Sequence, residues 1–440
     1  MIKSNTSISV YEYDPIKDHE LVDSLKQLFR VDRDHSKYIK LHNGVLSFKH
    51  FVGTLQTRTY TLSVLPKIWQ RDNRTKTEIR KNLIRLLLYT YIDTSLFRPD
   101  MESGSDYENQ DLFELLIMFY ARTLDQQLEE GIFRKYVRIN EESSYLRGRL
   151  NLKKQINKLD KSKFDITDFR FSADNELNRF FARCTNLLSA LAKDPRNLNL
   201  LAPIQLLLRS ENVPDSSLPT RVDFNRLNER FRIPYAYGDL ILNHLRIESG
   251  MGDRTMMMLF DMNIVFQEFV VKFFNRNKAK IFPGIEVKLL SQHSNRNFIF
   301  EGTKALRSTK PDLKIVFPAG DGDRTITVDM KYKILEEPKI EEDTDDSEDN
   351  VFSIGPSDLY QMFTYSELYE SDDNIFIFPG PENKCLGPYQ FKRNGRRLWI
   401  YMLNIDLNKD EWEMEQAEHF KKFFEKLKEH NRSDEVVITI

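Results

Sequence analysis

The chain has 440 residues, of which 40% are hydrophobic and 12% aromatic. A single core seldom grows past ~250–300 residues, so this length predicts two or three domains. Lys and Arg total 65 against 67 for Asp and Glu, which gives a formal charge of -2. That balance excludes a protein whose whole surface is a nucleic-acid-binding patch.

The two cysteines, Cys184 and Cys385, are too few for a disulfide framework and lie in no metal-ligand spacing. The N-terminus has no apolar segment of signal-peptide length, and no run of ~18 apolar residues occurs. We therefore expect a soluble protein of the cytoplasm with no membrane partner.

Residues 1–75 predict a small α+β module, with a helix near 17–30 and strands at 45–48 and 59–65. The last of these strands ends at Pro66, which is compatible with an edge strand at a domain surface.

Residues 76–252 predict a helical middle region. Apolar residues recur at helical spacing from about Lys76, at 112–128 and at 177–191. Residues 193–235 contain five prolines, which predict connecting structure around short helices.

Residues 253–440 predict a third domain in which helices and strands are mixed. Its expected elements, in order, are helix 260–274, strand 285–290, helix 359–368, strands 374–378 and 398–403, and helix 411–429. Ser357 is the expected N-cap of the second helix. The segment 336–350 carries nine acids and one lysine, which is too polar to pack and predicts a mobile loop.

Two segments of this domain, 310–317 and 325–333, predict a β-hairpin joined by a turn that contains Gly and Asp. Side chains in a strand point alternately to either face, so Asp329 and Lys331 project from the same face. Asp312 begins the partner strand, and the hairpin would bring its carboxylate near Asp329.

Two carboxylates in a buried site repel each other unless a cation lies between them. Mg²⁺ and Mn²⁺ prefer such oxygen ligands, so Asp312, Asp329 and the main-chain carbonyl of Met330 are candidate metal ligands. Lys331 would orient or deprotonate a water activated by the metal, and this set suffices for phosphodiester hydrolysis. The alternative is that these residues form only the solvated face of an exposed hairpin.

Gln361 and Tyr365 lie four residues apart and therefore share one face of the downstream helix. In that position they would contact a phosphate or a base. Without the hairpin, the same spacing is typical of an ordinary helix surface.

The order of an apolar helix, Lys310-Pro-Asp312, Asp329-Met-Lys331 and Gln361-x-x-x-Tyr365 resembles the PD-(D/E)xK nuclease superfamily. Further motifs resemble the McrC family, the nuclease subunit of McrBC-type modification-dependent restriction systems: Leu65-Pro-Lys-Ile68, Leu146-Arg-Gly-Arg149, Asp174-Asn-Glu-Leu-Asn178 and Met262-Asn-x-x-Phe266. The resemblance spans most of the chain. It implies a C-terminal restriction-endonuclease-like domain with a mixed central sheet flanked by helices, in which Asp312 and Asp329 bind the metal and Lys331 is the catalytic lysine.

One position departs from the superfamily pattern. Its members often carry a Glu on the first helix that faces the metal, and in McrC-like chains this Glu tends to follow the Phe. Here Gln267 holds that place and Glu268 follows it. The two differ by ~100° around a helix, so only one can face the site; Glu268 is the candidate ligand.

The resemblance also implies partners: DNA carrying methylated or otherwise modified bases, and a GTP-hydrolysing AAA+ hexamer of the McrB type whose GTPase the chain stimulates. The sequence has no Gly-x4-Gly-Lys-Ser/Thr phosphate loop, so the chain is not its own motor. Residues 1–75 and the helical region would then form the partner-binding arm. Two rivals stay open: a non-catalytic adaptor that activates the hexamer and only holds DNA, and a stand-alone repair nuclease.

Overall fold

The structure is a computed structural model. It describes residues 6–30, 37–42, 45–57, 60–70, 74–92, 111–215, 222–250, 253–291, 296–301, 303–318, 323–335, 354–429 and 436–438. The acidic segment 336–350, expected to be a loop, lies outside the described residues.

The chain forms two compact units, each assembled from separate stretches of sequence. One unit holds residues 54–61 and 91–258 together with the first six, and the other holds residues 7–53, 62–90 and 259–440. The division into segments 1–75, 76–252 and 253–440 stays a prediction. Among the described residues, no helix is both long and apolar enough to span a membrane.

The larger unit contains a seven-stranded mixed sheet, with the order β11-β14-β15-β16-β18-β17-β19. The strands are β11 Lys288–Ser291, β14 Leu313–Phe317, β15 Arg324–Met330, β16 Asp373–Gly380, β17 Lys384–Phe391, β18 Arg397–Asn404 and β19 Val436–Ile438. β14 and β15 form the antiparallel hairpin, and β15, β16 and β18 run parallel to one another. The expectation of a mixed α/β architecture is confirmed.

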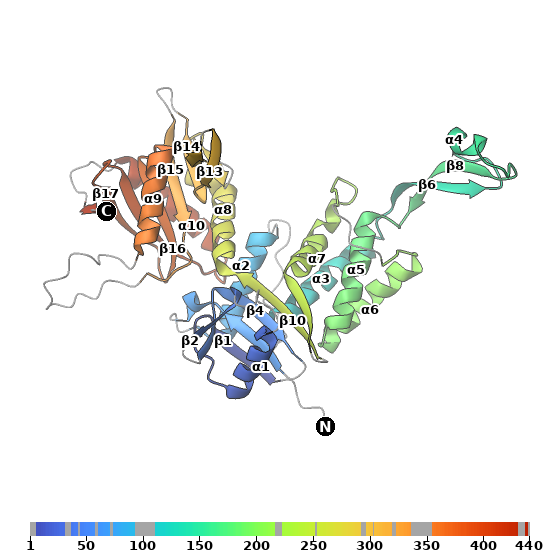
Figure 1. Ribbon diagram of the computed structural model, residues 1–440, viewed down its shortest axis with the longest axis horizontal. Helices are drawn as coiled ribbons and strands as arrows, with labels where there is room; N and C mark the ends of the chain where they lie inside the picture. The colour runs from blue at the N-terminus through green and yellow to red at the C-terminus, as the bar shows by residue number, and fades with distance from the viewer. Residues whose placement is uncertain are drawn as a thin grey trace. The chain divides into compact units, whose positions relative to one another are not determined.

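Helices cover both faces of this sheet. On one face, α9 (Pro356–Tyr369) packs Met362 and Tyr365 against Phe376 and Phe378 of β16 (Figure 1). On the other face lies α10 (Trp412–Glu429), which reaches β18 through aromatic pairs such as Tyr401 with Phe420, 4.4 Å between ring centroids. Side chains alternate between the two faces along each strand, so successive residues of β16, and likewise of β18, pack against opposite helix layers.

The helix α8 (Met262–Ile281) joins the α10 layer, and its N-cap Asp261 accepts a hydrogen bond from Asn263 N at 3.0 Å. Phe273 and Phe274 of α8 pack against Phe420, with centroid distances of 5.7 and 4.8 Å. The first helix expected in this domain therefore forms, beginning two residues later than predicted.

N-terminal elements belong to the same unit: α1 (His19–Arg30), β2 (Ile39–His42), β3 (Val45–Phe48) and α2 (Lys76–Tyr91). Two buried side chains tie this part to the segment after β18. Trp69 Nε1 and Asn82 Nδ2 both donate to Ile405 O, at 2.9 and 3.0 Å, and Leu407 N donates to Asn82 Oδ1 at 2.8 Å.

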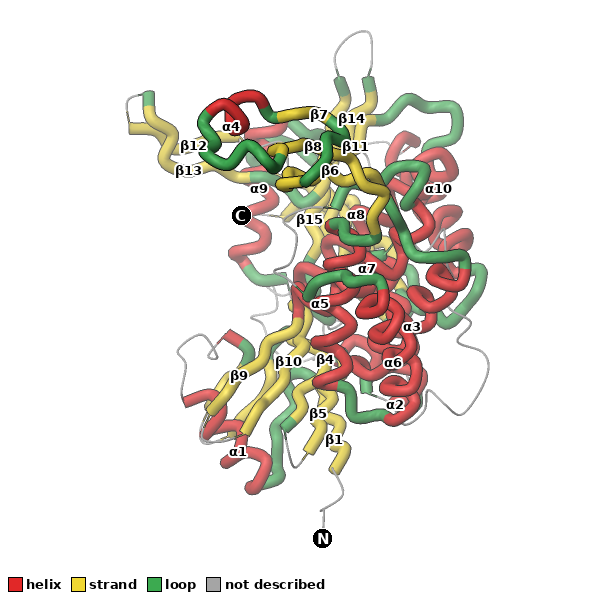
Figure 2. The backbone as a smooth tube through the Cα atoms, turned by 90° about the vertical axis from the view of Figure 1, so that its right-hand side faces the viewer, coloured by secondary structure: helices red, strands yellow, loops and turns green. Residues whose placement is uncertain are grey.

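A five-stranded sheet has the order β1-β5-β4-β10-β9, which Figure 2 shows as adjacent strands. Its strands are β1 Thr6–Tyr11, β4 Phe51–Gln56, β5 Tyr60–Leu65, β9 Leu245–Gly250 and β10 Asp253–Asp261. β5 lies between β1 and β4 and is buried along its whole length. The expectation of an edge strand was wrong, because Pro66 follows the strand and removes no donor from its ladder.

The smaller unit is built on helices α3 Leu112–Glu129, α5 Glu176–Leu191, α6 Pro195–Ser210 and α7 Arg232–His244. The α6 helix replaces the predicted proline-broken connection. Pro195 stands at its first turn, where no helical N–H is lost, and Pro203 is accommodated inside the helix.

A three-stranded sheet, β6-β8-β7, was not predicted in the helical region. It comprises β6 Lys135–Ser143, β7 Arg149–Leu150 and β8 Phe164–Ser172, with the short helix α4 Leu152–Ile156. Exposed and half-buried residues alternate along β6, and Tyr136 and Phe171 pair across the strands with their rings 5.3 Å apart.

Candidate active site

The predicted hairpin lies inside the seven-stranded sheet. Leu313 pairs with Val328, which sets Asp312 beside Asp329 at the start of β14 and the end of β15. Asp329 is 2% exposed and Thr327 is fully buried. The alternative of a solvated hairpin face is therefore wrong, because β16 pairs with this part of β15 and Met362 of α9 contacts the Thr327 side chain.

Asp312 is held by donors from two elements. Met330 N donates to Asp312 Oδ2 at 2.8 Å, and the Gln267 amide of α8 donates to Oδ1. Burial and the neighbouring carboxylate of Asp329 raise the pKa of Asp312 to about 7, although both hydrogen bonds act to lower it.

Asp329 and Lys331 lie on one face, as predicted, with Lys331 Nζ 2.9 Å from Asp329 Oδ2. This contact is an ion pair, and no other donor reaches that oxygen within the described part of the chain. Burial raises the pKa of Asp329, and the lysine lowers it less than burial raises it. Burial alone would lower the pKa of Lys331, but the surrounding carboxylates raise it above its usual value.

Gln361 and Tyr365 share one helical face, as predicted, and form a relay beside the lysine. Lys331 Nζ donates to Gln361 Oε1 at 2.7 Å, and Gln361 Nε2 donates to Tyr365 OH at 2.7 Å. Tyr365 OH in turn donates to Lys310 O at 2.8 Å. The relay fixes the lysine to the first residues of the hairpin; contact with a phosphate or a base stays a prediction.

A third carboxylate, Asp358, was missed in the sequence. It lies in the first turn of α9, buried, with Lys331 Nζ 3.8 Å from its Oδ1 and Lys333 Nζ 2.6 Å from its Oδ2. Its spacing of three residues before Gln361 would have placed it on the same helical face.

Of the two candidates on the first helix, it is Gln267 that contacts Asp312. Glu268 is exposed one position further around α8. Among the described residues, no group of three or more His, Cys, Asp or Glu is arranged to hold a metal ion. Asp312, Asp329 and the main chain offer oxygen ligands at this site, and metal binding by Glu268 stays a prediction.

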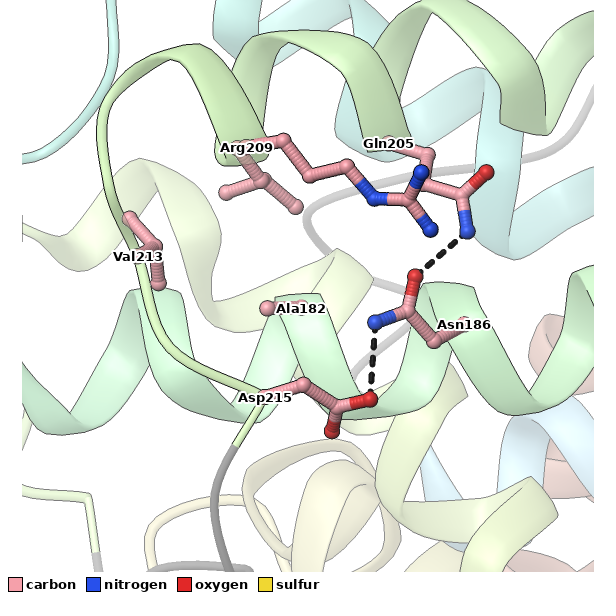
Figure 3. Close-up of a pocket in the computed structure, with 7 residues that line it drawn as sticks. Ala182, Asn186, Gln205, Arg209, Val213 and Asp215 are labelled. Atoms are coloured by element: carbon pink, nitrogen blue, oxygen red, sulfur yellow. Dashed lines mark hydrogen bonds between the residues drawn. The ribbon is translucent and has the colours of Figure 1, made fainter.

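A small polar cavity in the other unit lies between α5, α6 and the segment that follows α6 (Figure 3). Asn186 bridges it, accepting from Gln205 Nε2 at 2.5 Å and donating to Asp215 Oδ2 at 2.8 Å. The polar side chains of Asn186, Gln205 and Asp215 are thus hydrogen-bonded to one another. None of the predicted site residues lines the cavity.

Comparison with known proteins bears on the whole chain. A family model described as McrBC 5-methylcytosine restriction system component matches residues 46–379. The chain is similar to a solved structure described as a refined half-complex from a tetradecameric assembly of Thermococcus gammatolerans McrB AAA+ hexamers with bound McrC. The identity is 21%, the TM-score is 0.60, and the match covers 96% of this chain and 100% of that chain, which supports the fold.

A second solved structure, the cryo-EM structure of the Thermococcus gammatolerans McrBC complex, matches at 26% identity with a TM-score of 0.43. It covers 62% of this chain and 88% of that chain. The search of curated proteins gave no match.

Proposed function

Because the chain belongs to the McrBC 5-methylcytosine restriction system component family, we propose that it is the McrC-type endonuclease subunit of such a system. The observation that carries the proposal is the meeting of Asp312, Asp329 and Lys331 at one end of a buried hairpin. The helix α9 and then β16, a strand parallel to β15, follow the hairpin, which is the order expected of a PD-(D/E)xK nuclease domain.

The proposed cofactor is Mg²⁺ or Mn²⁺, and the donor set fits it. Two adjacent carboxylates with raised pKa values gain from a cation, and among the described residues Asp329 Oδ2 has no donor besides the Lys331 ammonium, 2.9 Å away. Two carboxylates and the Met330 carbonyl would leave the remaining positions to water and phosphate, as Mg²⁺ prefers. When bound, the metal would neutralise charge on the phosphodiester and acidify a water.

Each protein group then has a role that follows from its contacts. Asp312 and Asp329 would hold the metal, and the two donors on Asp312 fix the direction of its carboxylate. Lys331 keeps its proton because its pKa is raised, so it would orient the attacking water or stabilise the phosphate as a hydrogen-bond donor. Gln361 would keep the lysine pointed at the reacting atoms.

The proposed partners are DNA with methylated bases and a McrB-like AAA+ hexamer that hydrolyses GTP. Support comes from the family and from the related structure, in which McrC is bound to McrB AAA+ hexamers. This chain would supply the cutting site and stimulate the GTPase of the hexamer, and both would work in the cytoplasm.

The test is cleavage of 5-methylcytosine-containing DNA with Mg²⁺, GTP and the AAA+ partner. Asp329→Ala and Lys331→Ala should lower the cleavage rate by roughly 10²-fold or more and leave partner binding intact in a pull-down. Lys409→Ala and Asp410→Ala, which change an exposed pair after β18, are the matched controls and should cut at the wild-type rate. Wild-type cleavage by the first two variants would contradict the proposal.

One observation favours the non-catalytic adaptor. Gln267 stands where the superfamily often has a metal-binding Glu, so the site has one acid fewer. An adaptor would stimulate the GTPase of the partner while cutting no DNA under any metal tested. Measuring both activities on one preparation separates the two functions.

A further inference from the structure

A buried carboxyl from the N-terminal part of the unit lies against the end of β15. Glu12, directly after β1, is 1% exposed, and its Oε1 accepts hydrogen bonds from Tyr332 OH at 2.5 Å and from Lys67 N at 3.0 Å. Its Oε2 is buried and receives no hydrogen bond from the described residues. Burying a carboxyl with one oxygen unsatisfied is costly, so the placement needs an explanation.

The backbone around Glu12 is firmly held. Glu12 N donates to Leu65 O at 3.0 Å, and Tyr13 N donates to Phe48 O at 2.7 Å. Tyr13 adopts a positive φ of 64°, and Lys67 Nζ lies 4.1 Å from the centroid of its ring. A non-glycine residue keeps this conformation only where its surroundings enforce it. The backbone that carries the Glu12 carboxyl is thus fixed by its surroundings.

Tyr332, which receives this contact, is the centre of a tight turn. Lys333 N donates to Lys331 O at 2.9 Å, which closes a three-residue turn around Tyr332. The two lysines that flank the tyrosine both reach Asp358, at 3.8 and 2.6 Å. The Tyr332 ring is 4% exposed and packs on Phe266, the residue before Gln267, with centroids 6.2 Å apart.

We propose that Glu12 is a positioning residue for Lys331. Its hydrogen bond to Tyr332 fixes the turn, and the turn sets the Lys331 ammonium between Asp329, Asp358 and Gln361. This inference rests on the proposed function of Lys331. It assigns to the N-terminal part of the chain an indirect hold on Lys331, through Tyr332, which lies 320 positions from Glu12 in sequence.

The test compares two tyrosines that make the same kind of bond in one unit. Tyr332→Phe deletes the bond to Glu12, and Tyr89→Phe deletes the 2.7 Å bond from Tyr89 OH to Glu413 Oε1, a partly buried pair between α2 and α10. Both variants remove one hydroxyl and would lower stability by similar amounts. Only Tyr332→Phe removes a hydrogen bond from the turn that follows β15.

Single-turnover cleavage of methylated DNA by the complex of full-length chain and AAA+ partner should slow by about tenfold or more for Tyr332→Phe, with unchanged DNA affinity. Tyr89→Phe should stay within about twofold of wild type. Glu12→Ala should behave as Tyr332→Phe, while Glu12→Gln keeps an acceptor for the hydroxyl and should restore most of the rate. Equal rates for the two tyrosine variants, or no rescue by Gln over Ala, would overturn the inference.

Amide hydrogen exchange gives a readout that does not need activity. The amides of Lys331 and Lys333 are both hydrogen-bonded, and they should exchange faster in Tyr332→Phe and not in Tyr89→Phe. If this difference is found and wild-type protein still cuts no DNA, the positioning stands and the proposed function fails. If the exchange at these two amides is unchanged, the inference fails whatever the cleavage result.

Discussion

Asn82 should hold the N-terminal and C-terminal stretches of the larger unit together, and Asn82→Leu tests this. The side chain is fully buried and joins two main-chain groups, Ile405 O at 3.0 Å and Leu407 N at 2.8 Å. Leucine has a similar volume and fills the same space, so the substitution deletes the hydrogen bonds and leaves no large cavity.

The magnitude follows from what each partner retains. Ile405 O keeps the donor of Trp69, so that loss is about 0.5–1.5 kcal/mol, whereas Leu407 N loses its acceptor and costs about 1–3 kcal/mol. The sum of about 1.5–4.5 kcal/mol corresponds to a fall in Tm of roughly 3–18 °C for a unit of this size.

Differential scanning fluorimetry of Asn82→Leu against Asn275→Leu is the assay. Asn275 is exposed on α8 and donates within its own helix, to Val271 O at 2.9 Å, so its replacement should change stability by less than about 0.5 kcal/mol. Trp69→Phe removes the second donor to Ile405 O, and the double variant should cost more than the sum of the single ones. Equal Tm values for the two leucine variants would refute the reasoning.

Three other outcomes are expected. Gln267→Glu adds a carboxylate beside Asp312, so Tm should fall without metal, and Mg²⁺ should raise it more than in wild type; an equal Mg²⁺ shift would contradict the metal assignment. Burial raises the pKa of Glu12 from 4.5 to about 7, so the folded state binds this proton more tightly. The free energy of unfolding should therefore fall by about 3 kcal/mol as pH rises from 4.5 to 7. Urea unfolding at several pH values should show that the free energy of unfolding depends less on pH in Glu12→Gln; an unchanged pH dependence would exclude Glu12 as its origin. Gly148 has a φ of 68°, and an added Cβ would lie 2.5 Å from Thr167 O, so Gly148→Ala should cost about 1–3 kcal/mol and speed hydrogen exchange in β8, whereas unchanged exchange would show that the turn adapts.

The site was predictable where residues with reactive side chains follow the regular spacing of a strand or a helix. Asp312, Asp329 and Lys331 follow from strand periodicity and one turn, and Gln361 with Tyr365 from helical spacing; the structure brings all five together. Whether they bind metal and cut DNA stays a prediction.

Asp358 was missed because a lone Asp in the first turn of a helix usually serves the helix itself. Only the tertiary position of Lys331 and Lys333 gives it another role. Ser357 was wrongly expected as the N-cap: Gly355 occupies that place with no side-chain hydrogen bond.

The fold was predictable where apolar periodicity is long and uniform, as in α3, α8 and α10. Short strands with charged residues were not predictable. In β6, Arg138 and Glu142 take exposed alternate positions, and Ile139 between them is only half buried. The strand is stabilised by its pairing with β8, a contact of long sequence separation that no local pattern carries.

The discontinuity of the larger unit has a consequence for protein synthesis. Asn82 leaves the ribosome 323 residues before its partner Ile405, an interval of roughly 15–65 s at ~5–20 residues per second. The smaller unit, which takes the uninterrupted stretch 91–258, emerges in between. In a nascent chain, α2 therefore lacks its buried hydrogen-bond partner until synthesis reaches the last tenth of the sequence. A truncated product lacks this contact, so a chain that ends before Ile405 cannot complete the larger unit.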